Sequence, residues 1–164
     1  MVKTIEVVAL GEAMLEFNQT AAGQGAYQQG YGGDTSNAVI AAARAGVRAA
    51  YLTRLGDDTF GDALMALWQR EGVDTQAVER DETAPTGIYF VTHSQKHGSL
   101  GHEFSYRRAG SAASAMTPAW LSRGTNALVA SAKILHLSGI SLAISPQACD
   151  TALAAMQSAR HSQT

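Results

Sequence analysis

The chain has 164 residues, of which 46% are hydrophobic and 16% are charged, and its formal net charge is −2. This length and composition predict an ordinary globular domain with a sizeable core. The weak negative charge gives no electrostatic basis for binding nucleic acid or an anionic membrane.

Targeting signals and metal motifs are also missing from the sequence. No apolar run reaches the length of a membrane span, and the opening "MVKTIEVVAL" is too short and too mixed for a signal peptide. Cys149 has no second cysteine to pair with, so we expect a reducing, cytoplasmic compartment. The five histidines show no HExxH pattern and predict no metal site.

Strands and helices alternate through the first half of the chain. "IEVVALGEAM" begins with a β-branched run and predicts a buried strand that stops at Gly11. Residues 35–45 have a helical pattern, and "VRAAYLTRLG" predicts a second strand. "DDTFGDALMALWQREG" predicts a helix, with Thr59 and Asp62 at capping-box spacing.

The second half begins with a different pattern. Residues 86–108 alternate apolar and polar side chains around "SQKHGSLG" and predict a hairpin. "TPAWLSRGTNALVASA" predicts one helix capped by Thr117, and "KILHLSG" another buried strand. "SPQACDTALAAMQSA" predicts a last helix, with Cys149, Leu153 and Met156 on one face.

Strands alternating with helices imply a mostly parallel sheet covered on both faces. Segments 13–31 and 86–108 do not fit this sheet and would form a small accessory sheet beside it.

The stretch "GYGGDTSNAVIAAARAG" places glycines directly before a predicted helix. Unpaired N–H groups at a helix start, approached closely through Gly32 and Gly33, can hold a polar or anionic ligand, and Asn37 could add an amide contact. An equally weighted alternative is a tight turn in which Asp34 or Thr35 caps the helix. The order lacks GxGxxG, no clear strand precedes it, and no GK[ST] follows, which disfavours a dinucleotide site and excludes a P-loop.

The predicted hairpin ends in a possible anion contact. Tyr106 and Arg108 are two residues apart on a strand and so share a face, whereas Arg107 points the other way. An arginine fork suits a carboxylate. From the residues alone, a solvated arginine beside a half-buried tyrosine is the favoured alternative. Glu12 and Glu16 are four apart, but neither is predicted to be a catalytic base.

Four ordered segments resemble the ribokinase, or PfkB, family of carbohydrate kinases. "GGDTSNAVIAAARAG" resembles the family's first motif, and "VVALGEAMLEF" (7–17) its opening strand and lid entry. "RLGDDTFGDALMALWQREGVDT" (54–75) resembles its G-D-D-x-x-G segment, in which Asp57 and Asp58 are expected to cap a helix. "YRRAGSAAS" (106–114) is similar to the segment typical of 2-keto-3-deoxygluconate kinases.

The resemblance implies a ribokinase-like three-layer α/β/α fold with a mostly parallel sheet and a small β-lid. Residues 1–164 would be the N-terminal part of one such domain, with lid segments near 13–31 and 86–108. The implied reaction is transfer of the ATP γ-phosphate, with Mg²⁺, to the terminal hydroxyl of the sugar acid 2-keto-3-deoxygluconate. A homodimer formed through the lid is also implied. The positions that match sugar-contacting residues of the family are Gly32, Gly33, Asn37, Glu16, Tyr89, Tyr106 and Arg108.

The chain departs from the family in its later part. Family members are about twice as long and carry a G-A-G-D motif whose aspartate is the catalytic base. This sequence has neither G-A-G-D nor D-T-x-G and ends in "RHSQT". We therefore expect an incomplete C-terminal half, no catalytic residue in this chain, and no activity from it alone. Two alternatives stay open: a non-catalytic remnant that binds sugar or pairs through its lid, and a related fructokinase or nucleoside kinase.

Overall fold

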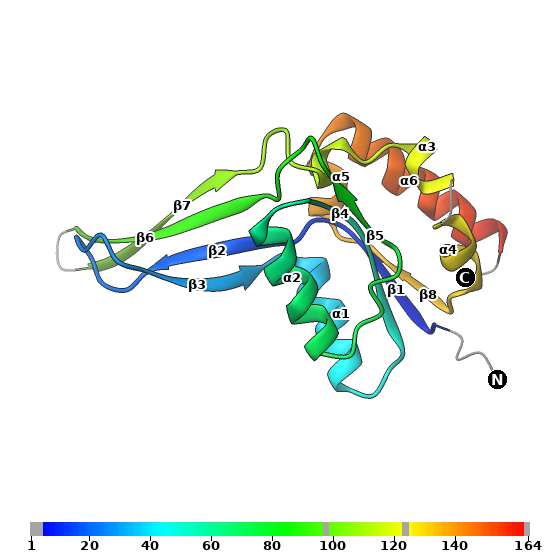
Figure 1. Cartoon of the computed structure of the whole chain (residues 1–164), viewed down its shortest axis with the longest axis horizontal. Helices are drawn as coiled ribbons and strands as arrows, with labels where there is room; N and C mark the ends of the chain where they lie inside the picture. Colours follow the sequence, from blue (N-terminus) through cyan, green and yellow to red (C-terminus); the bar gives the residue numbers. More distant parts are fainter. Residues whose placement is uncertain (1–4, 97–98, 123–124, 163–164) are drawn as a thin grey trace.

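Two four-stranded sheets organise the part of the chain described by the computed structural model, which is residues 5–96, 99–122 and 125–162 (Figure 1). The body sheet is parallel throughout, in the order β5-β4-β1-β8. Its strands are β1 (Val7–Leu10), β4 (Ala49–Gly56), β5 (Val78–Asp81) and β8 (Ile134–His136). The lid sheet is mixed, in the order β3-β2-β6-β7. Its strands are β2 (Met14–Gln19), β3 (Tyr27–Gly32), β6 (Ile88–Lys96) and β7 (Ser99–Arg107).

Helices cover both faces of the body sheet, which confirms the predicted three-layer α/β/α fold. Both faces of β1 are apolar and need cover, because successive side chains of a strand point to opposite faces. Val8 and Leu10 pack into the hydrophobic core on one face of the sheet, and Ala9 packs into the core on the other face. One face is covered by α1 (Asp34–Arg44) and α2 (Thr59–Arg70). The other is covered by α3 (Pro118–Ser122), α4 (Asn126–Ser131) and α6 (Pro146–His161), and α5 (Gly139–Ala143) packs on α6.

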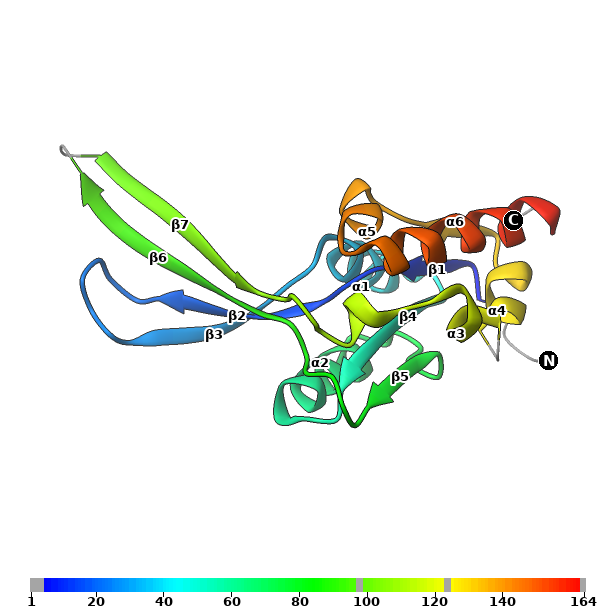
Figure 2. The ribbon, with the colours of Figure 1, turned by 90° about the horizontal axis from the view of Figure 1, so that it is seen from above.

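The lid sheet projects from the body, at the end opposite both chain termini (Figures 1 and 2). It is assembled from two distant segments, because β2 pairs in parallel with β6, Leu15 opposite Ile88. Phe17 of β2 meets Phe60 of α2 edge to face, with ring centroids 5.9 Å apart. The lid is therefore anchored at its base and stands away from the body along the rest of its length.

Asp58 joins the base of the lid to the start of α2. Its Oδ1 accepts a hydrogen bond from the Gly61 backbone N–H at 2.8 Å, so Asp58, rather than Thr59, is the N-cap of this helix. Its Oδ2 accepts from the Thr86 backbone N–H, also at 2.8 Å. Burial acts to raise the pKa of Asp58, but these N–H donors outweigh it and hold the pKa below its ordinary value.

The helices between β7 and β8 depart from the sequence-based prediction. Instead of the single helix expected over residues 117–132, the described residues form two short helices, α3 and α4. Thr117 caps α3 as expected, accepting from the Trp120 N–H at 3.2 Å. On α6, Leu153 and Met156 share an exposed face, while the buried face carries small residues that allow close packing: Ala148, Thr151, Ala152, Ala155 and Ala159.

Among the described helices, none combines the length and the apolar character that crossing a membrane requires.

Candidate functional site

The glycine turn joins the lid directly to the body. Strand β3 ends at Gly32, although the sequence shows no clear strand directly before the helix, and Gly33 is the N-cap of α1. Gly33 has φ 120°, a backbone conformation that favours glycine, and a Cβ atom there would stand 2.6 Å from the carbonyl oxygen of Glu12. The cap is thus Gly33 rather than Asp34 or Thr35, and it brings the start of α1 against the chain that enters the lid.

Tyr89 packs against this turn from the lid. A Cβ atom at Gly32 would lie 2.4 Å from the Tyr89 hydroxyl oxygen, so this ring position depends on glycine. The Tyr89 hydroxyl donates to the Glu16 carboxylate in a short hydrogen bond. Burial, and then this bond, raise the pKa of Tyr89 above its ordinary value. Tyr89 is therefore a fixed, protonated side chain at the base of the lid.

Aromatic contacts continue from Tyr89 to the predicted anion-binding arginine. Tyr106 lies opposite Tyr89 on β7, and the two rings stack with centroids 5.6 Å apart. The guanidinium carbon of Arg108 lies 6.0 Å from the Tyr106 ring centroid, so Tyr106 and Arg108 meet on one side of the lid base. Arg107 instead donates to the Ser105 hydroxyl at 3.1 Å, as the alternation along a strand predicts.

Arg108 has a partner that sequence reasoning missed. Its Nη2 contacts Oε2 of Glu12, whose side chain is only 1% exposed. The other Glu12 oxygen, Oε1, accepts from the Ser111 hydroxyl at 2.7 Å. Burial raises the pKa of Glu12, against the opposing effects of Arg108 and Ser111. The sequence offered one signal for this pair: an acid directly after a buried strand, at the point where the chain leaves for the lid.

These contacts connect six residues in a closed series that runs between the lid and the body. In order, each touching the next, they are Gly32, Tyr89, Tyr106, Arg108, Glu12 and Gly33. Glu16 joins the series through Tyr89. Asn37 is exposed on α1, bonded through its backbone N–H to the Gly33 carbonyl at 2.9 Å, and its side chain takes no part in these contacts. We call the six residues the lid-base ring.

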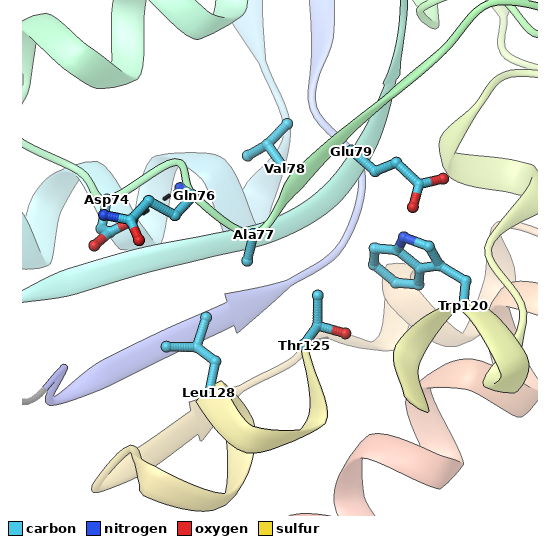
Figure 3. A pocket seen from close by; sticks show the side chains of 8 residues that line it. All are labelled: Asp74, Gln76, Ala77, Val78, Glu79, Trp120, Thr125 and Leu128. Atoms are coloured by element: carbon cyan, nitrogen blue, oxygen red, sulfur yellow. Dashed lines mark hydrogen bonds between the residues drawn. The ribbon is translucent and has the colours of Figure 1, made fainter. Parts of the chain in front are cut away.

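Two of the hollows in the described part of the chain lie beside strands of the two sheets. One, of about 360 Å³, lies on the lid beside Glu16, among Asn18, Gln28 and other polar residues. The other, of about 520 Å³, lies between β5 and helices α3 and α4 (Figure 3). It is lined by Asp74, Gln76, Ala77, Val78, Glu79, Trp120, Thr125 and Leu128, so it contains none of the predicted site residues. In the described part of the chain, no three His, Cys, Asp or Glu side chains gather as a metal ion requires.

Known proteins are similar to this chain in sequence and in fold. The model of the pfkB family of carbohydrate kinases matches residues 4–164. A 2-dehydro-3-deoxygluconokinase of Thermoproteus tenax is 37% identical over 150 residues, which covers 88% of this chain and 44% of that protein. Fructokinase-2 of Solanum habrochaites is 33% identical over 145 residues, covering 85% of this chain and 42% of that protein.

Solved structures agree with the sequence matches. The crystal structure of a PfkB protein from Polaromonas sp. JS666 superposes with a TM-score of 0.88 at 30% identity, covering 98% of this chain and 53% of that one. The chain thus spans about half the length of the relatives it matches. With a family model that covers nearly every residue and relatives above 30% identity, the chain belongs to the pfkB family of carbohydrate kinases.

Proposed function

We propose that this chain supplies the sugar-binding and lid part of an ATP-dependent kinase for a sugar acid, 2-keto-3-deoxygluconate. The observation that carries the proposal is the lid-base ring, in which Arg108 and two tyrosines meet the glycine turn. A guanidinium offers a permanent charge and several donors to a carboxylate, and aromatic faces pack on a sugar ring. The similarity to a 2-dehydro-3-deoxygluconokinase supports the same substrate class.

Each member of the proposed site has a role in holding the sugar. Arg108 would bind the carboxylate, and Tyr106 and Tyr89 would cover one face of the sugar. Glu16 would accept hydrogen bonds from sugar hydroxyls, and the Gly32–Gly33 turn would let the sugar approach the backbone, with Asn37 at its edge. By lying over the sugar, the lid would also exclude water from the reacting hydroxyl.

The nucleotide and its metal do not fit the residues of this chain. The sequence has no G-A-G-D motif, and among the described residues no three His, Cys, Asp or Glu side chains are grouped. We propose that ATP, Mg²⁺ and the catalytic base belong to a part of the protein outside these 164 residues. The chain by itself would then bind sugar without transferring phosphate, because phosphoryl transfer requires the base and the charge stabilisation together.

A fructokinase is the second candidate. Fructokinase-2 of Solanum habrochaites is nearly as similar as the sugar-acid kinase. The pairing of Arg108 with Glu12 also favours it, because a guanidinium whose charge is balanced by a carboxylate can still donate to the hydroxyls of a neutral sugar.

Phosphate transfer by the full-length protein separates these candidates. We expect ATP-dependent phosphorylation of 2-keto-3-deoxygluconate with a kcat/KM at least tenfold above that for fructose or a nucleoside. A preference for fructose would replace the first candidate by the second. Phosphate transfer by the 164-residue chain alone would contradict the placement of the ATP site elsewhere.

We also propose that the full-length protein pairs with a second copy of itself through the lid. Phe104 and Tyr106 of β7 are 55% and 48% exposed, on the same face as the buried Tyr89. Because the lid sheet stands off the body, it is open to pairing with a second lid (Figure 2).

A further inference from the structure

The Glu12–Arg108 contact lies where the chain enters and leaves the lid. Glu12 is between β1 and β2, and Arg108 directly follows β7. Ser111, the second partner of Glu12, follows three residues later and also accepts from the Ser114 N–H, at 3.2 Å. Glu12 therefore holds Arg108 from the body side, whereas Tyr106 lies against it from the lid side.

Glu12 occupies only part of the guanidinium. Because Oε1 of Glu12 is engaged by Ser111, only Oε2 contacts Arg108, at Nη2. A guanidinium has five N–H donors, and the Nε of Arg108 is buried with no hydrogen-bond partner among the described residues. A quarter of the Arg108 side chain, 25%, is exposed. The single contact with Glu12 therefore does not saturate the guanidinium, part of which is exposed.

The charge of Arg108 is nevertheless largely balanced. When Glu12 is ionised, the pair has no net charge, and a carboxylate this deeply buried repels any second anion on the same guanidinium. A neutral oxygen acceptor does not meet this repulsion. Glu12, as well as Arg108, therefore determines how strongly the site prefers an anionic ligand over a neutral one.

We propose that Glu12 is a specificity-determining residue, which tunes through Arg108 how strongly the site prefers an anionic sugar over a neutral one. The inference rests on the proposed sugar-binding role of Arg108. It differs from a purely structural role, because a structural ion pair would change stability without changing the ratio of affinities for charged and neutral ligands.

Calorimetry on the full-length protein tests this ratio. The ligands are 2-keto-3-deoxygluconate and its carboxamide, a neutral ligand of the same shape. Glu12→Gln keeps the shape and a hydrogen-bonding oxygen but removes the charge, so the preference for the acid should rise by roughly tenfold. Glu12→Asp, which keeps the charge, should stay within about threefold of the wild-type ratio. Thermal unfolding of each variant verifies that it is folded.

Two matched variants complete the test. Arg107→Ala removes a charge on the opposite face of β7 and should leave the ratio unchanged. Arg108→Ala should abolish the preference, and adding Glu12→Gln to it should have no further effect. If Arg108→Ala abolishes the preference for the acid but Glu12→Gln does not change it, this inference is overturned and the proposed function still holds. A ratio unaffected by Arg108→Ala would overturn both.

Discussion

The ring of Tyr89 lies so close to Gly32 that a Cβ atom at this glycine would stand 2.4 Å from the Tyr89 hydroxyl oxygen and 2.6 Å from its Cε1. Tyr89 cannot move away freely, because it is bonded to Glu16 and stacked on Tyr106. A lid side chain and the glycine turn of the body are therefore fitted to each other. Two residues far apart in sequence thus define the place where the lid meets α1.

Replacing Gly32 by alanine should displace the Tyr89 ring and open the lid-base ring. We expect a loss of about 1–3 kcal/mol in the free energy of unfolding, typical of an overpacked site, and at least tenfold weaker sugar binding. Denaturant unfolding and calorimetry of the full-length protein measure the two effects. Gly25→Ala is the control, since a Cβ atom there meets nothing within 4 Å. Equal behaviour of the two variants would show that the Gly32–Tyr89 fit is not required.

Replacing Asp58 by alanine should destabilise the junction of α2 with the lid. The variant loses the helix cap at Gly61 and the acceptor of the Thr86 N–H, for which we expect a cost of about 1–3 kcal/mol at pH 7. Because the pKa of Asp58 is lowered in the folded protein, its ionic contribution is present above the ordinary value of 3.8 and is lost as the pH falls through the lowered pKa. Urea unfolding at pH 7 and below pH 3.8 should show the difference from wild type shrinking. A difference that grows on acidification would contradict this account.

Glu12 should give the opposite pH dependence. Burial raises its pKa in the folded protein above the ordinary value of 4.5, so the folded state binds the proton more tightly than the unfolded state does. This contribution to stability is complete below pH 4.5 and is lost as the pH rises through the raised pKa. Glu12→Gln cannot titrate, and its free energy of unfolding should fall less over this range. Parallel pH profiles for wild type and Glu12→Gln would show that the pKa is not raised.

The body of the fold can be predicted from the sequence, because the patterns that indicate its strands and helices are local. Alternating strands and helices predicted the parallel sheet and its two helical layers, and the parity of Tyr106, Arg107 and Arg108 predicted their orientations correctly. A contact between residues far apart in the sequence leaves no local sequence pattern of this kind. The Glu12–Arg108 pair is therefore not predictable from the sequence, although the sequence marks each residue separately as a candidate for function.

Packing explains which face of α6 is buried. Leu153 and Met156 share a face, as the periodic pattern predicts, and this face is exposed because close approach to the sheet requires alanines on the other one. At the glycine turn, β3 lies within the lid segment predicted over residues 13–31, but its mostly exposed residues give no clear pattern that marks a strand directly before the helix.

Lid pairing should depend on Phe104. We expect light scattering of the full-length protein at micromolar concentration to give the mass of a dimer. Phe104→Glu should give a monomer, because it places a charge on the exposed aromatic face. Arg107→Glu, an exposed change on the opposite face of the same strand, should stay dimeric. A monomeric wild-type protein would refute the pairing.

The most direct test of the central claim is the affinity of the full-length protein for 2-keto-3-deoxygluconate, measured by calorimetry in wild type, Arg108→Ala and Arg107→Ala. A hydrogen bond between charged groups is worth about 1.5–3 kcal/mol, so Arg108→Ala should weaken binding roughly tenfold to a hundredfold. Arg107→Ala should change it little, since that side chain leaves the opposite face. Equally small effects of both substitutions would mean that Arg108 does not hold the sugar acid, and would contradict the proposed function at its main physical support.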